Sequence, residues 1–333
     1  MAYNPKLSVY IITLKPKKKD ETKTFRDFLC EKYAGDSTTS EAKLLQDLFE
    51  TFVNSVGKDE FSKDDKNKRV MGVDDGQILP LTLSSKEGFF DGVIEGGKYG
   101  VLREYADTDK KADKQVILPS NAVLDKYYIL LNPVLNNSYA ILLVQSYTEV
   151  TIQGSITTLI DNLFSGCTSF YKVQIDSFVP NKFMERYKES AKVRMFSFTV
   201  PTQLSESLRN TIQEADQEFE VEIRIKPKSK AMSLDSEGTE KVIREYGRKT
   251  LDSQTLDNGN GKIYTVDALG HNANYDIEKE IRSIRPTIYL SDEGITSDPD
   301  TGIPDFSAIR TYCRNLLKDI RAERDINQNI DEF

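Results

Sequence analysis

Apolar residues are most concentrated between positions 121 and 180, where only two basic and four acidic side chains occur. Within this stretch, 127–131 and 139–144 are short runs of aromatic and branched residues, separated by turn-forming Asn and Pro. Runs of this length without polar alternation are typical of strands that are buried on both faces. The pattern therefore predicts a β-hairpin at the centre of the core.

A helical spacing follows this hairpin. From Ile156 to Phe164, apolar residues recur at intervals of three and four, Ser155 stands before them, and Gly166 comes after them. This arrangement predicts a helix of about three turns with Ser155 as its N-cap. A strand is expected next, at 170–178.

Elements on either side of this region alternate between strands and helices. Further strands are expected at 7–14, 89–94, 99–105, 193–200, 219–225, 262–268 and 286–290. Helices are expected at 24–33, after the capping residue Ser40, and at 205–215, 239–248 and 305–324. Gly96-Gly97 is expected to turn the strands around it into a hairpin, and the charged segments 57–69 and 107–114 are expected to be mobile loops.

This order of elements predicts an α+β fold with a mixed, largely antiparallel sheet and helices packed on its faces. A chain of 333 residues is long enough for two domains. We therefore expect an N-terminal α+β region over 1–115 and a main α+β domain over 116–333. One continuous domain remains the alternative.

Composition narrows the class of protein. Apolar residues make up 38%, charged residues 29%, and the mean hydropathy is −0.49, which is typical of soluble globular proteins. No apolar run approaches the length of a membrane span, and no basic segment followed by a long apolar one marks a secretory signal at the N-terminus. The three cysteines, Cys30, Cys167 and Cys313, are isolated, which fits a reducing, cytoplasmic compartment. Cys313 lies on the apolar stripe of the last helix and is expected to be a core residue.

Two motifs resemble ligand loops but lack a required member. The spacing from Gly92 to Lys98 fits a phosphate-binding loop, yet Tyr99 stands where Ser or Thr must bind Mg²⁺. The segment that starts at Asp298 begins like a calcium loop, but its sixth and twelfth positions are both isoleucine. We therefore expect no cofactor and no metal.

Catalytic residues are equally hard to assign. His271 is the single histidine, and the sequence marks no nucleophile or carboxylate as its partner. The strand at 219–225 carries Glu222 and Arg224 on one face, but the Glu-x-Lys of a divalent-metal nuclease is missing. No catalytic residue is predicted, and whether the chain is an enzyme stays open.

Two rows of cations stand out in a chain of net charge −8. One row starts at Arg224 in the strand at 219–225 and continues at every second position to Lys230. The other row runs along the last helix from Arg310 to Arg321, at i, i+4, i+8 and i+11. Cations spaced over about 17 Å of helix repel one another unless an anion lies alongside. That anion is an acidic patch of the same molecule, a phosphate backbone or an acidic protein. The candidate binding residues are Arg224, Lys226, Lys228, Lys230, Arg310, Arg314, Lys318 and Arg321.

These observations favour a cytosolic, non-catalytic binding protein that engages an anionic partner, an acidic protein or nucleic acid, through the basic rows. The alternative is a nucleic-acid-binding protein or a divalent-metal-dependent nuclease. A chain of this size that is rich in Lys, Asn and Asp also favours, on composition alone, a role in bacterial phage conflict. The sequence does not determine the oligomeric state.

Overall fold

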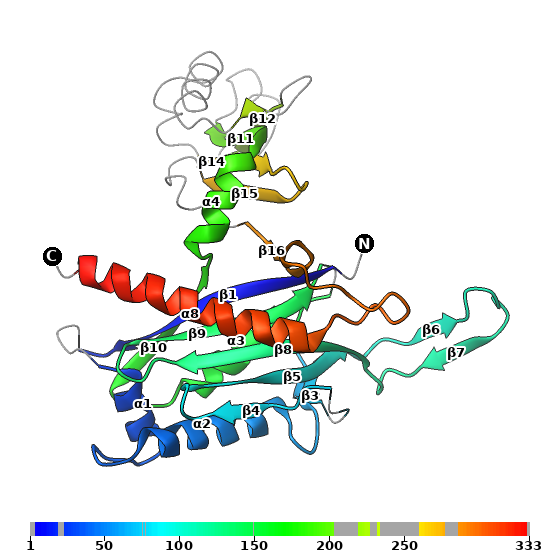
Figure 1. The fold of residues 1–333 in the computed structure, drawn as a ribbon. Coiled ribbons are helices and arrows are strands. Elements are labelled where there is room, and N and C mark those ends of the chain that lie inside the picture. The colour runs from blue at the N-terminus through cyan, green and yellow to red at the C-terminus, as the bar shows by residue number, and fades with distance from the viewer. Residues whose placement is uncertain are drawn as a thin grey trace, which may run out of the picture. The chain divides into compact units, whose positions relative to one another are not determined.

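The computed structural model describes residues 4–18, 23–74, 76, 78–148, 150–202, 219–226, 232–233, 260–276 and 286–331. The described residues form both helices and antiparallel sheets, which confirms the α+β class (Figure 1). The chain divides into two compact units, Met1–Phe178 with Ile288–Phe333, and Val179–Thr287. The boundary expected near residue 115 lies inside the first of these units. None of the described helices is long and apolar enough to cross a membrane.

A nine-stranded antiparallel sheet forms the first unit. Its main path is β10 (Phe170–Phe178), β1 (Pro5–Pro16), β9 (Tyr139–Tyr147), β8 (Val123–Pro133), β5 (Phe89–Lys98), β3 (Arg69–Val73) and β2 (Ser62–Asp64). In addition, β16 (Ile288–Tyr289) pairs with β1, and β4 (Thr82–Ser84) pairs with β5. A 3-10 helix, η2 (Leu290–Glu293), follows β16.

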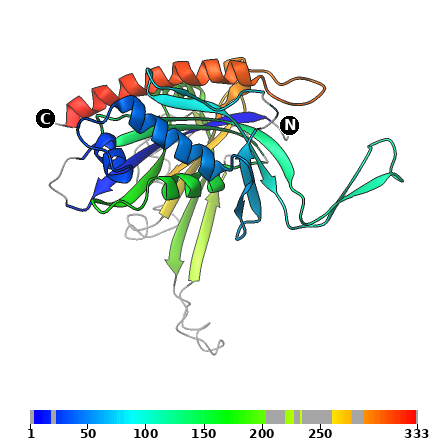
Figure 2. The same cartoon turned by 90° about the horizontal axis from the view of Figure 1, so that it is seen from below.

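Helices cover both faces of this sheet (Figure 2). One face carries α1 (Phe25–Lys32), α2 (Glu41–Val56) and α3 (Gln153–Leu163), and the other carries α8 (Phe306–Asp331). Between these layers, β8 and β9 form the expected hairpin, in which Ile129 lies opposite Val144. Every residue of β9 is buried. Because helices cover both faces of the sheet here, neither face of these strands meets water, and their apolar residues do not alternate with polar ones.

The helices end and pack largely as their sequences predict. Thr24 caps α1 in a capping box with Asp27, and Ser40 caps α2. The apolar stripe of α8 is buried, and Cys313 within it is fully buried, so its role as a core residue is confirmed. The helix α3 begins at Gln153 with Ile152 as N-cap, so the expectation that Ser155 caps it is wrong.

Two further expectations need correction. The Gly96-Gly97 pair lies within the continuous strand β5 and makes no turn. The reason is close approach, because a Cβ on Gly97 would lie 1.7 Å from the carbonyl oxygen of Val123 on β8. The segment 57–69 contains β2 and the turn of the β2–β3 hairpin, so it is not simply a loop. The segment 107–114 is the turn region of a second hairpin, formed by β6 (Arg103–Ala106) and β7 (Lys114–Ile117).

The second unit contains α4 (Asn181–Ser190) and a smaller antiparallel sheet. Its strands are β11 (Lys192–Thr202), β12 (Phe219–Ile225), β13 (Met232–Ser233), β14 (Asn260–Val266) and β15 (Asn272–Asp276). Tyr187 of α4 is buried and shares a 2.8 Å hydrogen bond with Thr265 of β14, which fixes the helix to the sheet. The helices expected at 205–215 and 239–248 lie outside the described residues.

Candidate functional site

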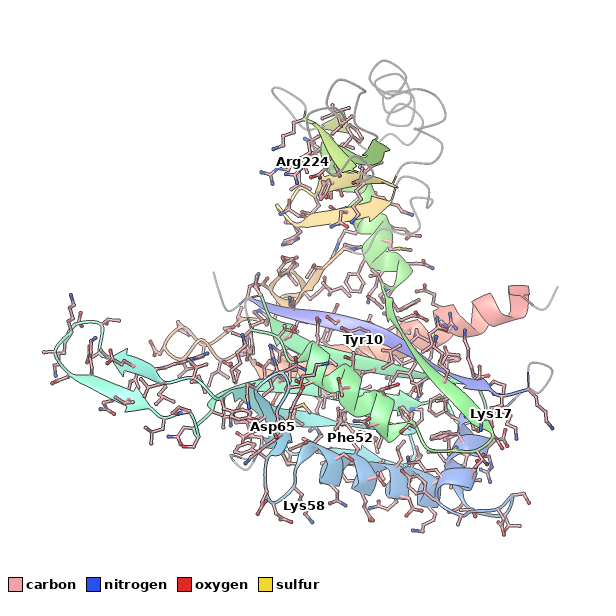
Figure 3. All side chains as sticks on the ribbon, turned by 180° about the vertical axis from the view of Figure 1, so that it is seen from behind. Tyr10, Lys17, Phe52, Lys58, Asp65 and Arg224 are labelled. Carbon is pink, nitrogen blue, oxygen red and sulfur yellow. The ribbon has the colours of Figure 1, made fainter. Side chains whose placement is uncertain are left out.

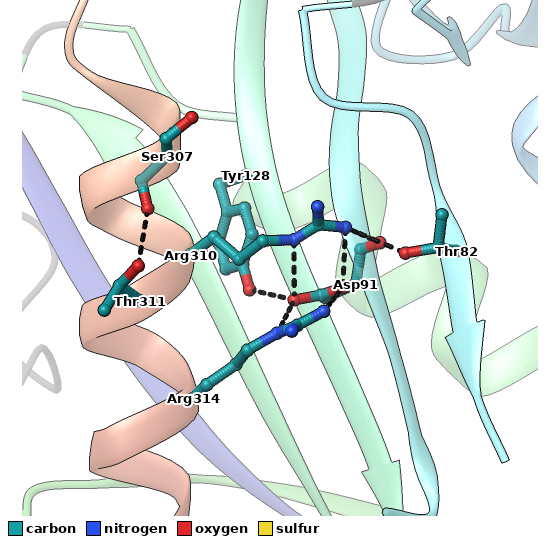
Figure 4. A network of polar contacts seen from close by, with 7 residues as sticks. All are labelled: Thr82, Asp91, Tyr128, Ser307, Arg310, Thr311 and Arg314. Atoms are coloured by element: carbon teal, nitrogen blue, oxygen red, sulfur yellow. Dashed lines mark hydrogen bonds and ion pairs between the residues drawn. The ribbon is translucent and has the colours of Figure 1, made fainter.

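The first two arginines of the α8 row point at the sheet and meet one carboxylate (Figure 4). Asp91 of β5 is completely buried. Arg310 donates to it through Nη2 at 2.9 Å and Nε at 3.2 Å, and Arg314 through Nε at 2.8 Å and Nη2 at 3.0 Å. Tyr128 adds a hydrogen bond at 2.8 Å, and Arg310 also reaches the hydroxyl of Thr82. One buried anion thus holds two helical cations.

The charges of this network stabilise one another. Burial by itself would raise the pKa of Asp91, but the hydrogen bonds from Arg314, Arg310 and Tyr128 outweigh burial and hold that pKa below its ordinary value. The same contact raises the pKa of the Arg314 guanidinium. Burial, together with the negative charge of Asp91, raises the pKa of the Tyr128 hydroxyl. Asp91 is therefore ionised at neutral pH, and the network docks α8 on the sheet.

For Arg310 and Arg314, the anion beside the α8 row is therefore a carboxylate of the same molecule, the first of the three alternatives that the sequence left open. Arg321 donates to Asn132 at 2.8 Å and to the carbonyl oxygen of Glu87 at 2.9 Å. Of the four residues in the row, Lys318 alone is exposed. The spacing of four residues that suggested a ligand-binding row instead places Arg310 and Arg314 over the same carboxylate.

The second row lies in the other compact unit. Arg224 on β12 is exposed and forms a 2.6 Å salt bridge with Glu222, which confirms that these side chains share a face (Figure 3). Lys226 is exposed as well, whereas Lys228 and Lys230 lie outside the described residues. The two rows belong to separate compact units.

His271 does have a carboxylate neighbour. Its Nδ1 lies 3.2 Å from Asp267 Oδ2, in the turn between β14 and β15. The other oxygen of Asp267 accepts the backbone N–H groups of Leu269 and His271, at 2.9 and 2.8 Å. The contact therefore orders the turn. Among the described residues, no group of three or more His, Cys, Asp and Glu side chains is placed to hold a metal ion.

A different cationic feature is a groove of about 590 Å³ in the first unit, called here the hairpin groove. It lies between α2, α3 and the β2–β3 hairpin, close to Asp65 in the view of Figure 3. Six residues with hydroxyl or amide groups line it, together with four basic, two acidic and three apolar residues. The residues that line it are Lys32, Thr51, Ser55, Ser62, Lys63, Asp64, Asp65, Lys66, Arg69, Met71, Ser155, Thr158, Leu159, Asn162 and Leu163.

The acidic residues of the groove are already engaged. Asp64 accepts the backbone N–H and the side-chain amide of Asn67, at 3.0 and 2.8 Å, which closes the hairpin turn. Asp65 accepts the hydroxyl of Tyr99 at 2.7 Å and lies 3.7 Å from the ammonium group of Lys68. These hydrogen bonds lower the pKa of both carboxyl groups, so both are ionised at neutral pH.

The basic residues of the groove differ in how they are held. Lys32 donates to the carbonyl oxygen of Ser165 at 3.1 Å, and Arg69 donates to the carbonyl oxygen of Thr151. Lys63 and Lys66, in contrast, are exposed and form no salt bridge with any residue that the structure describes. These two ammonium groups act on Asp64 and Asp65 only at longer range, so neither is held in a close ion pair with a described residue.

A buried hydroxyl in the same groove lacks a partner. Ser155 is 5% exposed, and its Oγ makes no hydrogen bond. A helical serine often bonds to the carbonyl four residues earlier, but here that carbonyl, of Thr151, accepts Arg69. Ser155 lies in the first turn of α3, where the partial positive charge of the helix end favours anions. A buried hydroxyl without a partner costs free energy, which a ligand oxygen would recover.

Sequence reasoning missed this groove because its wall comes from residues 32 to 163. The one local signal was the charged segment 57–69, which we interpreted as a mobile loop. Comparisons of the chain with family models, with curated proteins and with solved structures each find no match.

Proposed function

We propose that this chain is a binding protein that holds a small, phosphate-bearing ligand in the hairpin groove. The unpartnered Ser155 hydroxyl carries this proposal, because it is buried at a helix N-terminus in the same groove as two exposed lysines that form no salt bridge with a described residue. The anionic partner inferred from the sequence is retained, but its contacts move from the two basic rows to Lys63, Lys66 and Ser155.

The groove suits such a ligand in size and in lining. Small-molecule sites typically enclose about 300–1,000 Å³, and this groove has about 590 Å³. Phosphate oxygens would accept hydrogen bonds from the Ser155 hydroxyl and from the ammonium groups of Lys63 and Lys66. The side chains of Leu159 and Leu163 offer contact to an apolar or planar portion of the ligand.

Calorimetric titration with inorganic pyrophosphate and with a mononucleotide tests this proposal. We expect the double variant Lys63→Glu/Lys66→Glu to weaken binding by at least about tenfold, since two charge-assisted contacts are replaced by repulsion. The matched control is Lys110→Glu/Lys111→Glu in the turn between β6 and β7, which makes the same change in net charge outside the groove.

Binding of neither probe, or an equal loss in the control variant, would contradict the proposal. The same titration with single-stranded oligonucleotides of increasing length addresses the nucleic-acid alternative. Affinity that rises with strand length and falls steeply with salt would favour a nucleic-acid-binding protein instead.

A further inference from the structure

The hairpin of β6 and β7 is an arm that projects from the large sheet (Figures 1 and 2). Its two strands pair only with each other among the described strands, and every residue from 100 to 116 is exposed. An isolated two-stranded ribbon is marginally stable in water, so an arm of this kind gains from a surface that covers it.

Exposed apolar side chains gather on the arm and at its base. Eleven large hydrophobic residues are exposed in the described part of the chain, and seven of them fall between positions 101 and 124. Such a concentration on the arm and on the segments at its base is typical of an interaction surface. The seven are Val101, Leu102, Tyr105, Val116, Leu118, Val123 and Leu124.

One face of the arm carries an exposed apolar side chain, Val116, beside a salt bridge between Glu104 and Lys114. Glu104 pairs in register with Val116, and Lys114 lies one step further along the same face, 2.7 Å from Glu104. The side of the hairpin that carries Glu104, Val116 and Lys114 is called here the Glu104 face, and Leu102 and Leu118 flank its two strands at the base of the arm. The two leucines and Val116 are 51–59% exposed.

The charge of the arm points to its partner. Residues 103–114 carry four basic and four acidic side chains, in a chain whose net charge is −8. Two copies of an acidic molecule repel each other over most of their surface, but not where the local charge is balanced. The Glu104 face is also self-complementary, because a two-fold axis along the arm brings Glu104 of one copy toward Lys114 of the other.

We propose that two copies of this chain associate through the Glu104 face of their arms. Leu102, Val116 and Leu118 of each copy pack against the same residues of the second, and the two Glu104–Lys114 pairs become a four-charge network. The arm is a hairpin of two four-residue strands and therefore offers a small contact. Because small interfaces are typical of weak complexes, we expect a weak dimer that dissociates at micromolar concentrations. This inference is independent of the hairpin groove.

Sedimentation equilibrium of the full chain between 1 and 200 μM tests the inference through charge exchange. We expect a dimer for the wild type and monomers for Glu104→Lys and for Lys114→Glu, because like charges then face each other. An equimolar mixture of these two variants should form a heterodimer, which a misfolded variant could not do. Lys110→Glu, with the same charge change as Lys114→Glu but in the turn, should dimerise like the wild type.

Three results would each overturn the inference. They are a wild type that stays monomeric at 200 μM, single variants that dimerise unchanged, and a mixture that stays monomeric. The groove variant Lys63→Glu/Lys66→Glu should dimerise like the wild type, which keeps this test separate from that of the proposed function.

Discussion

The arginines of α8 and the lysines of the β2–β3 hairpin carry the same charge but differ in what lies beneath them. Arg310 and Arg314 converge on Asp91, which is fully buried and ionised. Lys63 and Lys66 border a groove whose carboxylates are held by other groups. The availability of a cation therefore depends on the nearest buried carboxylate, and only secondarily on the regular spacing of the cations.

Asp91→Asn, which removes the carboxylate beneath the two arginines, should have the largest effect. Two guanidinium groups and the Tyr128 hydroxyl would then lose their shared charged partner. We expect the free energy of unfolding to fall by about 3 kcal/mol, the cost of breaking a buried ion pair from one side. Urea unfolding followed by circular dichroism measures the change.

Asp109→Asn is the control for this variant, because it makes the same chemical change at an exposed position in the β6–β7 turn. Equal unfolding midpoints for the two variants would show that the Asp91 network does not hold α8 on the sheet.

The same carboxylate should make the stability of the protein depend on pH. Since the pKa of Asp91 is lower in the folded chain than in the unfolded chain, the folded state binds fewer protons there. Its stabilising contribution is therefore fully present above the unfolded value of about 3.9 and is lost as the pH falls below it. We expect the difference in unfolding free energy between the wild type and Asp91→Asn to be constant from pH 7 to 5. It should shrink below about pH 4, and urea titrations at pH 7, 5 and 3.5 would show this. A difference that stays constant at pH 3.5 would contradict the assignment.

The smallest effect is expected in the groove, where Ser155→Ala removes the unpartnered hydroxyl. Without ligand, we expect this variant to be more stable than the wild type by about 1 kcal/mol, because no buried polar group is left unsatisfied. Pyrophosphate should bind it more weakly. Thermal unfolding and calorimetry measure the two changes.

Ser146→Ala is the matched control for the groove variant. Ser146 on β9 is fully buried, its hydroxyl also lacks a partner, and it does not line the groove. It should gain similar stability and leave pyrophosphate binding unchanged. Weaker binding in both variants, or in neither, would remove Ser155 from the ligand site.

Much of the fold could be predicted because local pattern and tertiary environment agree. The hairpin of β8 and β9 was expected from its apolar runs, and α8 from its stripe of buried residues. The Gly96-Gly97 pair shows where local reasoning fails. Two glycines look like a turn in the sequence, yet they lie within β5, where a side chain on Gly97 would collide with β8 and one on Gly96 with Ile152 and the backbone of Val70.

The candidate sites were likewise predictable only as far as neighbouring residues of the sequence carry the signal. The row from Arg310 to Arg321 was visible in the sequence, but its orientation was not, because Asp91 lies more than two hundred positions away. The hairpin groove had no local signal beyond its charged segment, since its wall combines residues from three helices and a hairpin.

By itself, the sequence determined the α+β class, the central buried hairpin and the apolar face of the last helix. These features depend on the alternation of side chains over a few neighbouring residues. The tertiary structure decided which cations are neutralised and which remain available, because that depends on carboxylates brought close from distant parts of the chain. Electrostatic interactions and desolvation act through space, so no spacing along the sequence records them.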